Sequence, residues 1–252
     1  MKEIFLGLVP GSVFLYRYTP KFSLGTVSGL FLMEIMPFLI ISFIESISLI
    51  YVLIGFLLLY SVYDLGYLDN DSKAGQEKIG ATIRNQFSKF NYKLFFLIRI
   101  PLIAYAFIYV TTMNVAISGL SLGTILAIIP VFILHNRLEN RMLRISTFIA
   151  LNNLKIIARL LLLSPLLGYY LLSAIPHLFI KSLHYMNTKG LIAIDDACIK
   201  AITLPIYIGF FCGFIFIDPW LIVVSTPYFI NHTKSILFGI ILNKSKFFIE
   251  KD

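Results

Sequence analysis

Residues 47–84, ISLIYVLIGFLLLYSVYDLGYLDNDSKAGQEKIGATIR, join a long apolar run to an acidic segment. The run over 47–66 has the ~20 residues that an α-helix needs to cross a bilayer. Similar runs recur along the whole chain of 252 residues, which is 58% hydrophobic with a mean hydropathy of +0.87. A soluble domain of this length cannot bury so much apolar surface, and continuous rather than alternating runs disfavour a β-barrel. The sequence therefore predicts an all-α, polytopic bundle in a lipid bilayer.

The apolar runs predict about eight transmembrane helices, and seven or nine also fit because charged residues interrupt two runs. The expected spans are 24–44, 47–66, 94–116, 119–135, 147–163, 165–183, 201–217 and 219–242. Residues 1–22 read as an interfacial segment that leads into the first span. No linker or internal repeat divides the chain, so residues 1–252 are expected to form one membrane domain.

Basic residues gather on one set of connections. Most lie before the first span, in the loops 67–93, 135–146 and 184–200, and at the end of the chain. The positive-inside rule then places both termini and all three loops in the cytoplasm, as in a bacterial-type plasma membrane. Because the net charge of +8 is spread over several loops, it fits membrane orientation better than nucleic-acid binding.

Acidic residues are scarce, with only 13 in the chain, and six of them lie in or near two of these loops. The acids in question are Asp64, Asp69, Asp71 and Glu77 near the first loop, and Asp195 and Asp196 in the third. Because both loops face the same side, their carboxylates can converge over one cavity. Such an arrangement suits Mg²⁺ held between carboxylates and the oxygens of a diphosphate. The alternative is that the acids belong to solvated loops.

Three polar residues interrupt the predicted span 147–163. Asn152, Lys155 and Arg159 follow one another at spacings of three and four and therefore share one helix face. Charged side chains at membrane depth usually face a bundle interior or a cavity, where these would meet substrate phosphates. The alternative is an interfacial start to the helix with snorkelling side chains. Glu34, in the first span, either faces the same cavity or pairs with a basic residue such as Arg99.

Two motifs resemble those of the UbiA-type superfamily of intramembrane prenyltransferases. The first family motif opens with an Asn-Asp pair, matched here by Asn70 and Asp71, and continues with basic residues, matched by Lys78 and Arg84 within EKIGATIR. The later acids of that motif are missing, since position 74 is Ala.

The second family motif ends in an Asp seven residues before a Thr-Leu-Pro. Asp196 stands at that spacing before Thr203-Leu204-Pro205. The companion Asp four residues earlier is replaced by Ile192, and Asp195 is the nearest substitute.

The resemblance implies a Mg²⁺-dependent transferase that ionises a diphosphate and passes the carbocation to an acceptor. Either a prenyl group or a phosphoribosyl group is transferred, with a polyprenyl or isoprenoid lipid as partner. Catalysis would fall to Asp71 and Asp196 as main metal ligands, supported by Asp64, Asp69, Glu77 and Asp195. Substrate binding would fall to Asn70, Lys78, Arg84, Asn152, Lys155 and Arg159. The alternative function is a non-enzymatic membrane transporter or subunit that handles a lipid-linked intermediate.

Overall fold

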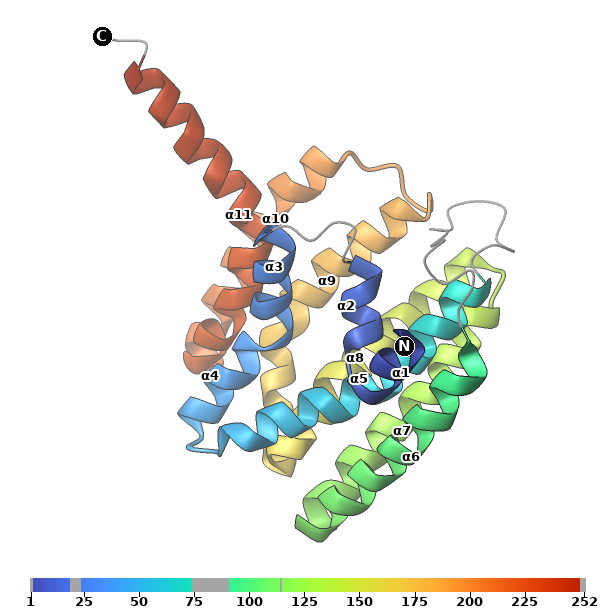
Figure 1. The fold of residues 1–252 in the computed structure, drawn as a ribbon. Coiled ribbons are helices and arrows are strands. Elements are labelled where there is room, and N and C mark those ends of the chain that lie inside the picture. Colours follow the sequence, from blue (N-terminus) through green and yellow to red (C-terminus); the bar gives the residue numbers. More distant parts are fainter. Residues whose placement is uncertain (1, 19–23, 74–90, 114, 250–252) are drawn as a thin grey trace.

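A computed structural model of the chain describes residues 2–18, 24–73, 91–113 and 115–249, which form helices joined by short connections (Figure 1). Seven segments among these residues are long and apolar enough to cross a membrane. The protein is therefore an all-α integral membrane protein, as predicted. The α-helices are α1 (Lys2–Leu8), α2 (Ser12–Tyr18), α3 (Leu24–Glu34), α4 (Met36–Ile44), α5 (Leu49–Lys73), α6 (Tyr92–Met113), α7 (Val115–Arg137), α8 (Arg141–Leu163), α9 (Leu171–Thr188), α10 (Asp196–Ile217) and α11 (Trp220–Ile249).

The helices reach farther into the polar sequence than predicted. α5 runs seven residues beyond the expected end at 66, and α8 begins at Arg141 instead of 147. α9 likewise ends later than expected and α10 begins earlier. Asn140 explains one of these starts, because its side chain accepts hydrogen bonds from the backbone N–H groups of Met142 and Leu143. The loops predicted at 67–93, 135–146 and 184–200 are therefore shorter than expected, because the helices that border them extend into these ranges.

The first span is divided between two helices. α3 ends at Glu34 and α4 begins at Met36, with Pro37 in its first turn. Proline has no N–H to donate and its ring collides with the carbonyl four residues earlier, so it interrupts a helix at this point. The break leaves the carbonyl of Glu34 available to a partner other than the helix itself.

The two N-terminal helices are fixed to the bundle by one buried ion pair. Arg99 of α6 donates to the carbonyls of Leu6 and Val9 at the end of α1. Asp64 of α5 accepts from the N–H groups of Gly11 (2.8 Å) and Phe14 (3.1 Å), at the start of α2. Arg99 and Asp64 themselves lie 3.2 Å apart, fully buried. This pair therefore satisfies the free groups at two helix ends together.

Gly11 makes the tight turn between α1 and α2. Its φ of 81° lies in the left-handed region, which glycine adopts without steric cost.

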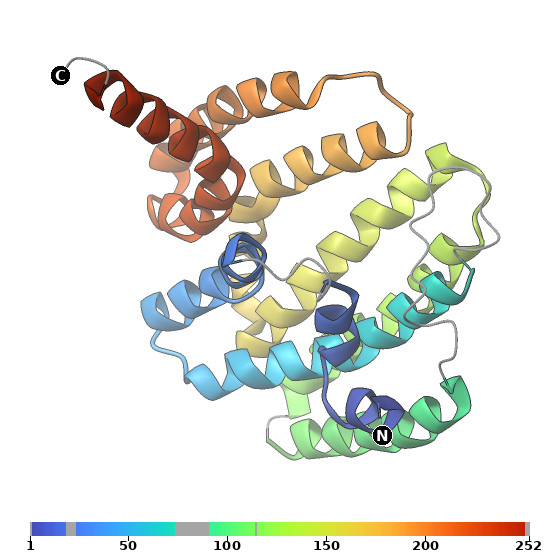
Figure 2. The same ribbon diagram turned by 45° about the horizontal axis from the view of Figure 1, so that its top comes forward.

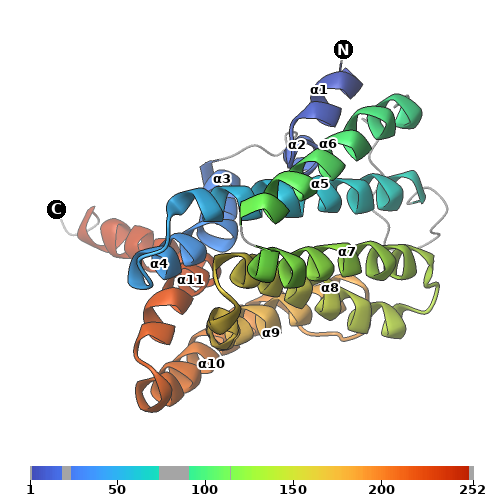
Figure 3. The ribbon, with the colours of Figure 1, turned by 90° about the horizontal axis from the view of Figure 1, so that it is seen from below.

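The remaining helices surround a centre formed by α5, α7, α8 and α9. α7 and α8 pack side by side along their lengths, and α5 crosses both of them (Figures 1 and 2). α1, α2 and α6 lie at one end of the molecule, whereas α10 and α11 lie at the other (Figure 3). The C-terminal end of α5 lies on the same side as the junction between α7 and α8 (Figure 2). α5, α8 and α9 each contribute polar side chains to one interior space.

Candidate functional site

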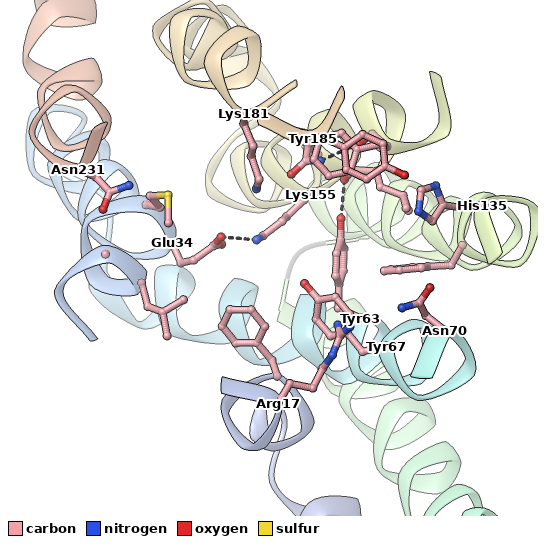
Figure 4. Close-up of a pocket in the computed structure, with 18 of the residues that line it drawn as sticks. Arg17, Glu34, Tyr63, Tyr67, Asn70, His135, Lys155, Lys181, Tyr185 and Asn231 are labelled. Atoms are coloured by element: carbon pink, nitrogen blue, oxygen red, sulfur yellow. Dashed lines mark hydrogen bonds and ion pairs between the residues drawn. The ribbon is translucent and has the colours of Figure 1, made fainter. Parts of the chain in front are cut away.

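A cavity of about 740 Å³ opens inside this bundle (Figure 4). Its walls come from α2, α3, α5, α7, α8, α9 and α11. A volume of this size suits a small molecule or the head group of a lipid. The polar side chains that line it are Arg17, Glu34, Tyr63, Tyr67, Asn70, His135, Asn136, Asn152, Lys155, Lys181, Tyr185, Asn231 and Lys234.

Glu34 is held by two cations of α8. Lys155 forms an ion pair with its carboxylate, and Arg159 approaches the other carboxylate oxygen at 3.3 Å. Arg159 also donates to the Glu34 carbonyl at 2.5 Å, the group freed by the break before Pro37. All three side chains are buried, which favours the interior alternative for Lys155 and Arg159 over snorkelling at an interface. The suggested partnership of Glu34 with Arg99 is wrong, because Arg99 pairs with Asp64.

Lys181 is the cavity's least engaged cation. It projects from α9 toward Lys155 and Glu34 (Figure 4). No hydrogen bond or ion pair joins it to another residue in the described part of the chain. A lysine ammonium group carries three donors, so Lys181 can receive an anion without breaking an existing bond.

Arg17 lines the cavity from the opposite side. Its guanidinium group donates to Asp71 at 3.0 Å and lies over the Tyr67 ring at 4.4 Å. Lys234 of α11 completes the set of cations. Among the described residues, the cavity is thus lined by four basic side chains and by one carboxylate, that of Glu34.

Aromatic and amide side chains form the remaining walls. Tyr63 donates to the carbonyl of Leu151 at 2.5 Å, and Phe148 stacks on Tyr185 with ring centroids 4.0 Å apart. Asn152, on the same face of α8 as Lys155, donates to the carbonyl of Phe148. Its carbonyl oxygen is left to accept hydrogen bonds within the cavity. The walls therefore offer apolar, cationic and hydrogen-bonding surfaces together.

Of the predicted Asn-Asp pair, Asn70 lines the cavity and Asp71 does not. The carboxylate of Asp71 is covered by Arg17, with a 2.9 Å contact between them. Two residues earlier, Asp69 accepts a hydrogen bond of 2.7 Å from Asn136. Both acids lie on α5, not on a loop.

The second acidic pair lies outside the cavity. Asp195 caps the start of α10 by accepting from the N–H of Ala197 at 3.2 Å. Asp196 accepts from Asn187 at 3.2 Å and is 69% exposed at its side chain. The convergence of Asp71 and Asp196 over a shared cavity stays a prediction, because neither of them lines this one.

Three of the predicted site residues, Glu77, Lys78 and Arg84, lie outside the described residues.

The described acids do not fit a Mg²⁺ site. A search of the described residues finds no group of three or more His, Cys, Asp or Glu side chains that gather as metal ligands do. Asp64 is surrounded by Arg99 and two backbone N–H groups, so its oxygens are already occupied. A hard divalent cation prefers several free carboxylate or carbonyl oxygens, and this cavity offers mostly positive charge.

A second, apolar pocket of about 260 Å³ borders the cavity at Glu34. It lies between α4, α5 and α8, and most of its lining is aliphatic or aromatic. Arg159 lines this pocket and lies over the Phe38 ring, 3.9 Å from its centroid. The Glu34–Arg159 pair therefore stands between a polar space and an apolar one.

Several lining residues were not singled out from the sequence. Lys181 and Tyr185 repeat at a spacing of four on α9, and His177 lies one turn earlier, where it shares a hydrogen bond of 2.9 Å with His232. This spacing is a signal that was present in the sequence. Arg17 gave no such signal, because its place depends on how α2 docks.

Comparison of the chain with known protein families, characterised proteins and solved structures finds no match. The resemblance to the UbiA-type superfamily therefore rests on the two short motifs alone. What stands is an integral membrane protein with seven candidate spans among its described residues.

Proposed function

We propose that this protein is an intramembrane transferase acting on a substrate that bears a prenyl or phosphoribosyl diphosphate. The observation that carries the proposal is the excess of cations in a cavity surrounded by apolar helices. Charged residues are costly at such a depth and are characteristic of functional sites. Lys155, Lys181 and Arg17 supply the positive charge that a diphosphate requires.

The reaction follows from the chemistry of such a substrate. The bond between carbon and the bridging oxygen breaks, and diphosphate departs with the electron pair. Cations in a site shielded from water stabilise the charge that develops on this leaving group. Aromatic rings such as Tyr63 and Phe132 can face the carbocation, and the enclosed site limits its reaction with water. The acceptor then forms the new bond to carbon and loses a proton.

The adjoining apolar pocket supports a lipid-soluble substrate. It adjoins the polar cavity at Glu34, so a ligand with a charged head and an apolar chain finds both environments side by side. The described residues do not gather a Mg²⁺ site, and no step here depends on one.

Turnover by reconstituted protein tests the proposal. Liposomes containing the full chain receive radiolabelled farnesyl diphosphate or phosphoribosyl diphosphate together with a lipid extract as acceptor. We expect label to pass into a new lipid product with wild type and with Lys200→Met, an exposed lysine outside the cavity, but not with Lys155→Met. Ligand binding without any product would favour the carrier or subunit function instead.

A further inference from the structure

The charge of the cavity bears on how it holds a phosphate group. In the described part of the chain, four basic side chains line it against one carboxylate, that of Glu34, which already contacts Lys155 and Arg159. A free divalent cation entering this space would meet net repulsion. A phosphate group would instead meet ammonium and guanidinium donors, with which it forms strong, charge-assisted hydrogen bonds.

The acids near the cavity are committed elsewhere. Asp71 binds Arg17, Asp69 binds Asn136, and Asp64 binds Arg99 together with two backbone N–H groups. In the sequence from 74 to 90, Glu77 is the single acid, accompanied by the basic residues Lys78, Arg84 and Lys89. The sequence of that segment therefore carries more positive than negative charge.

We infer that the cavity binds the phosphate group of its ligand directly on Lys181 and Lys155, without a bridging divalent metal ion. This inference rests on the proposed function, in which the cavity receives a phosphate-bearing lipid. Lys181 has no ion-pair partner among the described residues and accepts the ligand without losing one. It is the residue on which binding depends most.

Lys155 is paired with Glu34, but it can turn to a ligand without leaving Glu34 unpaired. When Lys155 turns from Glu34 to a ligand phosphate, the carboxylate keeps its contact with Arg159 at 3.3 Å. Arg159 also stays bonded to the Glu34 carbonyl. Glu34 is thus never left as an unpaired buried charge, which would be strongly unfavourable. The Glu34 carboxylate positions Lys155 until the ligand phosphate replaces it as the ion-pair partner of Lys155.

Direct binding of farnesyl diphosphate, measured on full-length protein in nanodiscs, tests the inference. Wild-type protein is titrated in excess EDTA and again in millimolar MgCl₂, with farnesol as the uncharged comparison. We expect the two affinities to agree within about threefold. Lys181→Met should weaken binding in EDTA by roughly tenfold to a hundredfold, the usual effect of losing a hydrogen bond to a charged group.

Lys181→Arg keeps the charge and should bind within a few-fold of wild type. Lys200→Met removes an exposed lysine outside the cavity and should bind as wild type does. The comparison of EDTA with MgCl₂ uses only wild-type protein, so it decides the matter even if a variant fails to fold.

Each outcome has one reading. Binding that survives EDTA and is lost in Lys181→Met supports the inference. Binding that requires MgCl₂, or that is unchanged in Lys181→Met, overturns it and leaves the proposed function standing. Absence of binding in both buffers, or equal binding of farnesol, overturns the inference and, with it, the prenyl diphosphate form of the proposed function.

Discussion

Replacing Asp64 by Asn tests whether this carboxylate is a structural anchor or a metal ligand. In the structure it is fully buried and pairs with Arg99. Removing one member of a buried ion pair typically costs about 3–5 kcal/mol, because the other charge is left uncompensated. Arg99 keeps two backbone carbonyl partners, so we expect a value near the lower end, about 3 kcal/mol. For a chain of this size that lowers Tm by roughly 6–12 °C.

The assay is thermal unfolding of the purified protein in detergent, followed by tryptophan fluorescence or by loss of the monodisperse peak. Asp195→Asn is the matched control, since Asp195 is exposed and Asn caps a helix about as well as Asp. Its Tm should stay within about 2 °C of wild type, because surface changes usually stay within ~0.5 kcal/mol.

A second substitution isolates the ion pair. Asp64→Asn combined with Arg99→Met leaves no buried charge at this position, and the new amide oxygen can still accept a hydrogen bond from Gly11 or Phe14, although the carbonyls of Leu6 and Val9 lose their donor. The double variant should therefore lose less stability than Asp64→Asn and Arg99→Met lose when their separate losses are added. The reasoning is refuted if Asp64→Asn keeps the wild-type Tm, or if the double variant loses as much stability as that sum.

Three further outcomes follow from the contacts. Gly66→Ala places a methyl group against the ring of Phe132 on α7 and should lower the free energy of unfolding by about 1–3 kcal/mol. Gly123→Ala has open space around it and should leave the stability unchanged; Tm values in detergent compare the two variants. Glu34→Gln should lower Tm without ligand but increase the Tm rise that farnesyl diphosphate produces, because Lys155 loses its internal anion; an equal rise in wild type would contradict this. Cysteine in place of Asn140 or Thr188 should resist an impermeant thiol reagent in intact bacterial cells, because both positions are expected to face the cytoplasm. Labelling of both would show that the orientation is inverted.

Much of the fold was predictable because the apolar runs are long. All eight expected spans have helical counterparts among the described residues, and seven of them are long and apolar enough to cross a membrane. The shared face of Asn152, Lys155 and Arg159 follows from the period of a helix. Boundaries were less predictable. Polar residues such as Asn140 and Asp195 begin helices through capping, although their polarity alone reads as loop.

The site was only partly predictable, for a different reason. Lys155 and Asn152 line the cavity as expected, and the spacing of Lys181 and Tyr185 on α9 was a further signal in the sequence, but Arg17 joins the cavity through the docking of α2. The place of Arg17 depends on tertiary packing between distant segments, which no local spacing encodes. Asp64 illustrates the opposite case. Its place in the sequence suggested a metal ligand, but its buried ion pair with Arg99 gives it a structural role.

Photo-crosslinking of a prenyl diphosphate that carries a diazirine near its diphosphate end is the most direct test of the central claim, that the cavity is a binding site for a lipid diphosphate. Irradiation of reconstituted protein, digestion and mass spectrometry locate the label. We predict modification of cavity residues such as Tyr63, Tyr67 and Phe148, and its suppression by excess unlabelled farnesyl diphosphate. A separate apolar groove lies between α9 and α10, lined by residues such as Phe179 and Phe210. Label confined to that groove, or label that excess ligand does not suppress, would contradict the account.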